Sequence, residues 1–321
     1  MERCDLITEY RHIPVLLHEC REHLALRAGE VYCDCTLGGA GHAIELANDI
    51  VPEGMLIGID QDEMAHQAAA KRLQAEMPDL RFMPLKGNFA QLDELLLAAK
   101  IPGVDAFLFD LGVSSPQLDI SARGFSYAQD APLDMRMDPG KQSLTAAEII
   151  NTSTEADLTW ILRTYGEEKW APRIAQFIVR QRLIAPVKTT SELVELIKAA
   201  IPQGARKTRG NPAKRTFQAL RIKVNAELDA LESGLDAAIR WLNPGGRIAV
   251  ISYHSLEDRI VKEKFAQLAR GCVCPPEAPV CVCGHQPILT IKTKRPLVAS
   301  DDEVSRNPRS KSAKLIVAVK N

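Results

Sequence analysis

The sequence predicts an α/β protein: a Rossmann-like core built on a parallel sheet and interrupted by a mostly helical insertion. Strand-like and helix-like segments alternate over residues 1–113. Alternation at this spacing is typical of a parallel sheet with helices on both faces. The alternation stops after Asp110, and strand signals resume at "PGGRIAVISYH", residues 244–254. We therefore expect a discontinuous core of residues 1–113 and 214–321, with residues 114–213 inserted as a helical domain.

Seven segments carry the alternation in the first part of the chain. Short apolar runs predict strands, and runs rich in Ala, Leu, Glu, Gln and Lys predict helices. Glu63 stands in the first turn of one such helix, where the helix dipole favours a negative charge. The predicted strands are residues 30–36, 54–60, 81–89 and 104–112, and the predicted helices are residues 42–49, 62–77 and 90–100.

The insertion begins with a loop-like stretch, residues 123–142, and continues with helical patterns. One helix is marked by Thr189 and Glu192, which have capping-box spacing, and by Pro202 after its end. Beyond the insertion, we expect one long helix and three strands. The helix spans residues 216–242, and the strands are residues 244–254, 287–294 and 312–320.

The composition is that of an ordinary globular protein. Hydrophobic residues make up 46% of the 321 residues and charged residues 25%. No apolar run approaches the roughly 18 residues of a membrane helix, and the charged first twenty residues show no secretory signal. Six of the eight cysteines fall in two tight groups, which favours a reducing compartment over a disulfide framework. We expect a cytoplasmic protein with no membrane partner.

A glycine-rich loop, "CDCTLGGAGHA", links the first predicted strand to the first predicted helix. Gly39 and Gly41 fit the first two places of a dinucleotide fingerprint, but the third place holds Ile44. The loop also lacks the Gly-Lys-Ser/Thr of a P-loop. Asp60 closes the next strand and suits both ribose hydroxyls of an adenosine, as in nicotinamide and S-adenosylmethionine sites. A plain βα turn remains the alternative for this loop.

Polar residues also follow the third and fourth predicted strands. Ligands of open α/β sheets bind beyond the carboxyl ends of the strands. Phe89 is placed to flank an adenine ring, and Asp110 opens a loop that contains Ser114, Ser115 and Gln117. The alternative for Asp110 is a structural carboxylate that caps the next turn.

A basic segment covers residues 204–223, with seven Lys or Arg and no acidic residue. Because the net charge of the chain is −1, a polyanionic partner would have to be met by such a local patch. We interpret the segment as a phosphate-binding strip that includes Phe217. The alternative is a solvated surface. The candidate RNA-binding residues are Arg206, Lys207, Arg209, Lys214 and Arg215.

Several motifs occur in order between residues 12 and 319. They are "HIPVLLHE", "CTLGGAGH", "GIDQD", "DLGVSSPQLD", "RGFS", "PLDMRMD", "YGEE", "RTFQALRI", "PGGR", "SYHSLEDR" and "NPRSKSAKL". On these motifs the chain resembles the bacterial small-subunit rRNA cytosine-N4 methyltransferases, the MraW/RsmH family. The resemblance implies S-adenosylmethionine as cofactor and a methyltransferase core with an inserted substrate-recognition domain. It also implies a cytidine in the decoding centre of 16S rRNA, within the small ribosomal subunit, as target, with no DNA partner.

The resemblance also implies a set of site residues. Its cofactor contacts correspond to Ala40, Gly41, His42, Asp60, Phe89, Asp110 and Gln117. Without the family, His42 would be interpreted as a surface residue at a helix start. We assign Asp110 as the catalytic acceptor for the cytosine amine.

Two features around the target base stay open. Many enzymes that methylate exocyclic amines carry Asp/Asn-Pro-Pro-aromatic after the fourth strand, whereas this chain has "DLGV" there. The base must therefore stack elsewhere, on Phe125, Tyr127 or Tyr253. In "HSLEDR", His254 either hydrogen-bonds the substrate or caps the following helix together with Ser255.

The cysteines argue against one reaction and leave one site open. Methylation at cytosine carbon 5 needs a nucleophilic cysteine, and no cysteine stands in the loop after the fourth strand. The tail "CVCPPEAPVCVCGH" either holds a tetrahedral zinc or carries four reduced or adventitiously oxidised cysteines, so we assign no metal ligand there. The four are Cys272, Cys274, Cys281 and Cys283. A nicotinamide-dependent oxidoreductase and a non-catalytic RNA-binding factor are the alternative functions.

Overall fold

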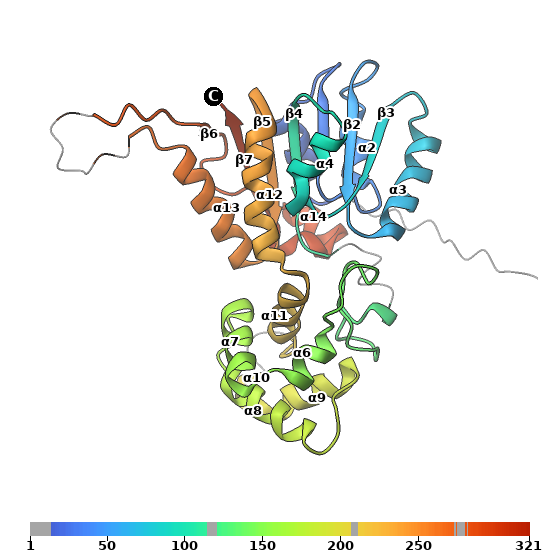
Figure 1. Cartoon of the computed structure of the whole chain (residues 1–321), viewed down its shortest axis with the longest axis vertical. Helices are drawn as coiled ribbons and strands as arrows, with labels where there is room; N and C mark the ends of the chain where they lie inside the picture. The colour runs from blue at the N-terminus through green and yellow to red at the C-terminus, as the bar shows by residue number, and fades with distance from the viewer. Residues whose placement is uncertain (1–13, 114–120, 207–210, 273, 275–279, 281) are drawn as a thin grey trace, which may run out of the picture. The chain divides into compact units, whose positions relative to one another are not determined.

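The computed structural model describes residues 14–113, 121–206, 211–272, 274, 280 and 282–321 (Figure 1). The chain forms two compact units. One unit combines Met1–Gly112 with Ser233–Asn321, and the other is Val113–Glu232. No helix among the described residues is both long enough and apolar enough to cross a membrane.

The first unit is built on a seven-stranded sheet in the order β3-β2-β1-β4-β5-β7-β6. Strands β1 to β5 pair in parallel, and β7 runs antiparallel to both β5 and β6. The strands are β1 Val31–Asp34, β2 Met55–Asp60, β3 Arg81–Lys86, β4 Val104–Asp110, β5 Leu242–Ser252, β6 Leu289–Ile291 and β7 Lys314–Lys320. The predicted α/β core is confirmed, because each of its predicted strands is present.

Helices cover both faces of this sheet, as the parallel strands require. Along β4, Ala106 and Leu108 face a core cluster shared with α1, α2 and α3. Phe109 points to the opposite face, where it lies against Gly234 of α12. Figure 1 shows α4 and α12 in front of the sheet. The helices of this unit are α1 Leu17–Leu24, α2 Gly41–Ala47, α3 Glu63–Glu76, α4 Leu92–Ala98, α12 Glu227–Trp241 (which begins in the other unit), α13 Ser255–Leu268 and α14 Asp301–Arg306.

The second unit is mostly helical and has its own apolar core. The predicted capping box is confirmed at α9: Thr189 accepts a hydrogen bond from the Glu192 amide, and Glu192 accepts one from the Thr189 amide. The helices are α6 Ala146–Thr152, α7 Glu155–Gly166, α8 Ala171–Arg182, α9 Thr190–Ala200, α10 Gln203–Arg206 and α11 Lys214–Asn225.

The predicted helix over residues 216–242 is wrong as a single element. The chain forms α11 and α12, separated at Ala226, which has a left-handed φ of 48°. The apolar face of α11, including Phe217 and Leu220, is buried in the core of the second unit. The return to the sheet unit therefore falls at Ser233 and not at residue 214. The apolar periodicity continues across Ala226, so the sequence pattern does not show that the helix breaks there.

Candidate active site

The carboxyl ends of the parallel strands carry a row of acidic side chains. Asp34 ends β1, Asp60 ends β2 and Asp110 ends β4. Strands β1 and β4 are neighbours, and the strand order reverses between them. A crevice for a ligand forms at such a reversal, beyond the strand ends. The carboxylates of Asp34 and Asp110 therefore stand at the place where this fold binds ligands.

The glycine loop between β1 and α2 is held in a tight, open turn. Gly38 and Ala40 have left-handed φ values of 49° and 59°. The Gly38 amide donates to Oδ2 of Asp60 at 2.8 Å, which ties the loop to the tip of β2. A Cβ built on Gly39 would meet no atom within 4 Å, so a ligand has room to approach the backbone there. Ala40 is fully buried, so its side chain is not available to a ligand.

Both oxygens of the Asp60 carboxylate accept main-chain hydrogen bonds. Oδ2 accepts from the Gly38 amide, and Oδ1 accepts from the Asp62 amide at 2.9 Å. Burial raises the pKa of Asp60, although these two hydrogen bonds act against the rise. Each carboxylate oxygen has capacity for a second hydrogen bond, so Asp60 can also accept from two ligand hydroxyls.

Phe89 lies in the short 3₁₀ helix Phe89–Gln91 that follows β3. Asn88 caps this helix by accepting a hydrogen bond from the Ala90 amide at 2.9 Å. The half-buried Phe89 ring meets Phe109 edge to face, with ring centroids 5.6 Å apart. A Cβ on Gly234 would lie only 2.7 Å from the Phe89 ring, so Gly234 leaves the space that this ring fills.

Asp110 is held by a tyrosine from the neighbouring strand tip. The hydroxyl of Tyr253, which follows β5, donates to Oδ1 of Asp110 at 2.7 Å. Burial, and then the negative charge of Asp110, raise the pKa of Tyr253 well above its usual value. The phenol therefore remains a hydrogen-bond donor at every ordinary pH, and it fixes one oxygen of the carboxylate. From the sequence, Tyr253 is one of three residues on which the target base could stack. In the structure its hydroxyl is hydrogen-bonded to Asp110.

His42 is buried, which corrects its interpretation from the residue alone as a surface histidine. Its Nε2 lies 2.8 Å from the carbonyl oxygen of Val15. Because a carbonyl only accepts, Nε2 carries the proton of that hydrogen bond. Its Nδ1 lies 3.5 Å from Oδ2 of Asp110, so the two oxygens of Asp110 face different side chains.

Asp34 also stands at a strand tip, although it is not among the site residues that the sequence predicts. Its side chain is 1% exposed, and Oδ1 accepts from the amide of Thr36 at 3.0 Å. The Thr36 hydroxyl in turn accepts from the amide of Asp110 at 2.7 Å, which couples the tips of β1 and β4. Burial raises the pKa of Asp34 from 3.8 to about 6. The signal in the sequence is an aspartate near the end of a predicted strand, two residues before a threonine.

Other residues singled out in the sequence belong to the second unit or have structural roles. Phe125 is buried in the core of the second unit, and Tyr127 meets Phe217 edge to face there at 5.6 Å. His254 caps α13, because its Nδ1 accepts from the Glu257 amide, so the capping alternative is confirmed. Gln117, Ser114 and Ser115 lie outside the described residues.

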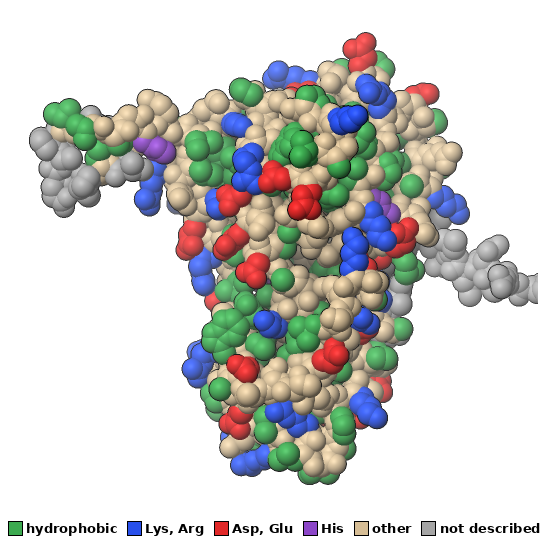
Figure 2. All heavy atoms as spheres, viewed as in Figure 1, with side chains coloured by type: hydrophobic (Ala, Val, Ile, Leu, Met, Phe, Trp, Pro, Cys, Tyr) green, Lys and Arg blue, Asp and Glu red, His purple; other side chains and the backbone are tan. Residues whose placement is uncertain are grey.

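The basic strip is only partly described. Lys214 is exposed at the start of α11, and Arg215 donates to the carbonyl of Glu167 at 2.8 Å. Arg206 ends α10, whereas Lys207 and Arg209 lie outside the described residues. Phe217 is 4% exposed, so its inclusion in the strip as an RNA-contacting aromatic is wrong. On the face that Figure 2 shows, Lys and Arg side chains are interspersed with Asp and Glu.

Comparisons with known proteins agree over nearly the full chain. A family model described as the MraW methylase family matches residues 9–321. Three relatives are each named ribosomal RNA small subunit methyltransferase H. The one from Symbiobacterium thermophilum is 54% identical over 311 residues and covers 97% of each chain. Those from Heliobacterium modesticaldum and Geobacter sulfurreducens are 53% and 52% identical, over 97% of this chain and 99% of each relative.

Proposed function

The chain belongs to the MraW methylase family, and on this premise we propose its substrate and site. It transfers a methyl group from S-adenosylmethionine to the exocyclic N4 of a cytidine in the decoding centre of 16S rRNA, within the small ribosomal subunit in the cytoplasm. The names of the full-length relatives support a small-subunit rRNA as substrate. The observation that carries the proposal is the position of Asp110 at the reversal of the strand order, with one oxygen held by Tyr253.

The strand tips fit this cofactor. Asp60 would accept from the ribose hydroxyls, Phe89 would flank the adenine, and the main chain of Gly39 to Gly41 would hold the methionine part. His42, Asp110 and Gln117 complete the set that the family implies. The open space over Gly39 and the spare acceptor capacity of Asp60 are the structural observations that support this fit. The cofactor supplies a methyl group that its positive sulfur already activates.

Asp110 acts on the acceptor amine. The lone pair of cytosine N4 is delocalised into the ring, so the amine is a poor nucleophile until it becomes pyramidal. Oδ2 of Asp110 accepts a hydrogen bond from N4–H, which favours the pyramidal amine and stabilises the positive charge that develops there. Tyr253 is a positioning residue, because its hydrogen bond to Oδ1 orients the carboxylate. The excess proton leaves N4 through Asp110 to water.

The decisive experiment is methyl transfer to small ribosomal subunits from cells that lack this methylation. We expect the purified protein to incorporate labelled methyl groups from S-adenosylmethionine at one cytidine N4, located by nuclease mapping and mass spectrometry. Label on another atom or base would refute the assigned product. Binding of NAD and not of S-adenosylmethionine, measured by isothermal titration, would favour the oxidoreductase alternative. The absence of label with S-adenosylmethionine bound would favour the non-catalytic alternative.

The role of Asp110 is tested separately at saturating cofactor. We expect Asp110→Asn to lower kcat by about 100-fold or more, because a neutral amide does not stabilise the developing charge as a carboxylate does. Isothermal titration of S-adenosylmethionine reports any loss of cofactor affinity in the same variant. Near-normal turnover would refute the acceptor role of Asp110 and leave the substrate assignment intact.

The basic strip is the proposed rRNA contact. Replacement of Arg206, Lys207 and Arg209 by Gln should weaken binding to small subunits and reduce the slope of log K against log salt by about 2 to 3. Affinity for S-adenosylmethionine should not change. A matched control replaces three exposed cations of the sheet unit, Lys71, Arg81 and Lys100, and should preserve the slope. Equal slopes for both triple variants would refute the strip.

A further inference from the structure

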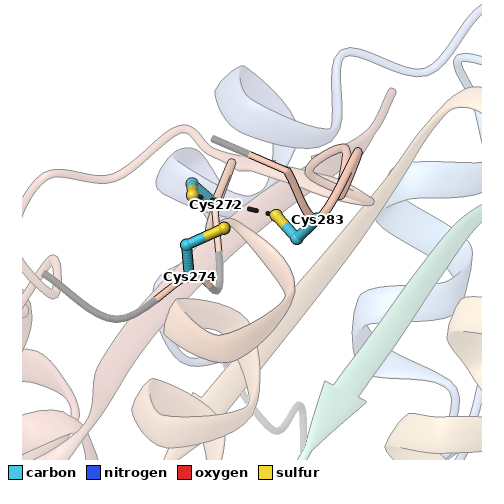
Figure 3. Close-up of side chains that lie close together, drawn as sticks. All are labelled: Cys272, Cys274 and Cys283. Atoms are coloured by element: carbon cyan, nitrogen blue, oxygen red, sulfur yellow. Dashed lines mark hydrogen bonds between the residues drawn. The ribbon is translucent and has the colours of Figure 1, made fainter. Parts of the chain in front are cut away.

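Three cysteines gather in the loop that joins α13 to β6, in the sheet unit. Cys272 and Cys274 follow α13, and Cys283 precedes β6. The Sγ atoms of all three lie within 4.8 Å of one another (Figure 3). Helix α13 begins next to Tyr253 and the strand tips, and the loop follows its opposite end. The cluster is therefore separate from the proposed cofactor site. Cys281, the remaining cysteine of the motif, lies outside the described residues.

The sulfur spacing fits a shared metal ion. The Sγ atoms of Cys272 and Cys283 lie 3.8 Å apart. A tetrahedral zinc with Zn–S bonds of about 2.3 Å places its sulfur ligands about 3.8 Å from one another. A disulfide needs about 2.05 Å between its sulfurs. The amide of His285 also donates to Sγ of Cys283 at 3.5 Å, the kind of hydrogen bond that supports a metal-bound thiolate.

Among the described residues of the loop, the valines are not buried. Val280 and Val282 lie within it and are 70% and 86% exposed. A short segment without a core of its own is commonly stabilised by a structural metal or a disulfide. Cys272 and Cys283 are exposed and Cys274 is half-buried, so an ion can reach these thiols from solvent.

The second cysteine pair, Cys33 and Cys35, provides a contrast within the same unit. Its Sγ atoms are also close, at 3.9 Å, but both side chains are buried. Burial raises the pKa of Cys35 well above its usual value, which disfavours the thiolate that a metal requires. No third cysteine joins this pair among the metal-ligand clusters of the described residues. Two sulfur atoms that lie close together therefore do not by themselves indicate a metal site. The loop cluster differs because it has three thiols that solvent can reach.

We propose that Cys272, Cys274 and Cys283 bind one zinc ion as thiolates and that this ion fixes the loop between α13 and β6. Binding releases three protons, one from each thiol, and changes no oxidation state. Three thiolates and Zn²⁺ carry a net charge of −1. The ion is structural: it has no part in methyl transfer, because it lies away from the strand tips. The fourth ligand is either another thiolate or water, and the experiment distinguishes the two.

The test measures metal in the full-length protein, purified under reducing conditions and dialysed against a weak chelator. We expect one zinc per chain by elemental analysis, and less than about a tenth of that in Cys272→Ser and Cys283→Ser. The matched control, Cys33→Ala, should retain the metal. Affinity for S-adenosylmethionine should be normal in both serine variants, which shows that they are folded.

Cobalt substitution and proteolysis supply readouts that do not depend on activity. Co²⁺ should give the strong thiolate charge-transfer bands of a tetrahedral site. Retention of their full intensity in Cys281→Ser would indicate water as the fourth ligand, and a loss of about a quarter would indicate a fourth thiolate. Zinc removal should open the segment of residues 269–288 to protease. Reduced protein that holds no zinc and gives no charge-transfer band, or that contains a Cys272–Cys283 disulfide, would overturn the proposal.

Discussion

Asp34 should make the stability of the protein depend on pH in a direction opposite to that of most carboxylates. Its side chain is 1% exposed, and burial raises its pKa to about 6 from 3.8. The folded protein therefore binds the Asp34 proton more tightly than the unfolded chain does between these two pH values. Well below pH 3.8, Asp34 is protonated in both states and does not lower the free energy of unfolding. Its ionisation lowers that free energy progressively as pH rises from 3.8 to about 6, and the loss is constant at higher pH.

The magnitude follows from the difference between the two pKa values, about 6 minus 3.8, or about 2.2. At 1.36 kcal/mol for each pKa unit, the ionised carboxylate lowers the free energy of unfolding by about 3 kcal/mol at neutral pH. The Asp34→Asn variant has no such cost, and its Oδ1 can still accept from the Thr36 amide. Its stability relative to the wild type should therefore increase by about 2 kcal/mol between pH 4.5 and 7.5.

The assay is urea unfolding of both proteins, without cofactor, at several pH values in this range. Titrating groups that do not interact with Asp34 contribute equally to the two proteins, so the difference between the two free energies of unfolding reports on Asp34 and the groups coupled to it. The slope m should be the same for both. A difference that stays constant within about 0.5 kcal/mol across the range would refute the raised pKa of Asp34.

The same carboxylate should couple to the cofactor, which carries positive charge at its sulfur and its amino group. Affinity of the wild type for S-adenosylmethionine should rise as pH increases from 5 to 7, because the cation favours ionised Asp34. Proton release on binding is measurable by calorimetry in buffers of different ionisation enthalpy. An Asp34→Asn variant with the same pH dependence would show that another group is responsible.

Three further substitutions test other parts of the structure. Tyr253→Phe should lower kcat roughly 10- to 100-fold with little change in the KM for S-adenosylmethionine, because Asp110 loses an orienting hydrogen bond. A comparable change in both kcat and KM would instead indicate that Tyr253 acts in cofactor binding. Gly234→Ala should displace Phe89 and raise the Kd for the cofactor about tenfold, measured by calorimetry; an unchanged Kd would remove Phe89 from the adenine site. The buried Asn225 side chain accepts from the amide of Met137 at 2.8 Å and donates to the carbonyl of Met135 at 2.9 Å. Asn225→Ala should lower the free energy of unfolding by about 2–4 kcal/mol, because both main-chain groups lose these hydrogen bonds; urea curves that superimpose on those of the wild type would contradict this.

Much of the sheet unit is predictable because short-range patterns encode it. Apolar runs and helix formers alternate along the chain, and parallel strands bring their carboxyl ends to one edge. These patterns alone are therefore enough to place Asp60 and Asp110 at a common edge. The break at Ala226 is not predictable, because helix periodicity continues on both sides and only packing shows which unit each half joins.

The amino-acid sequence by itself determined the α/β class, the inserted helices and the two acidic strand tips, since each depends on residues that are near one another in the chain. Only the tertiary structure decided the states of the side chains at those tips. Tyr253 bonds to Asp110 across 143 residues of sequence, and His42 is buried against Val15. The burial that raises the pKa of Asp34 comes from the surrounding fold. Hydrogen bonds and desolvation depend on distance in space, and distant segments meet only when the sheet and its helices pack.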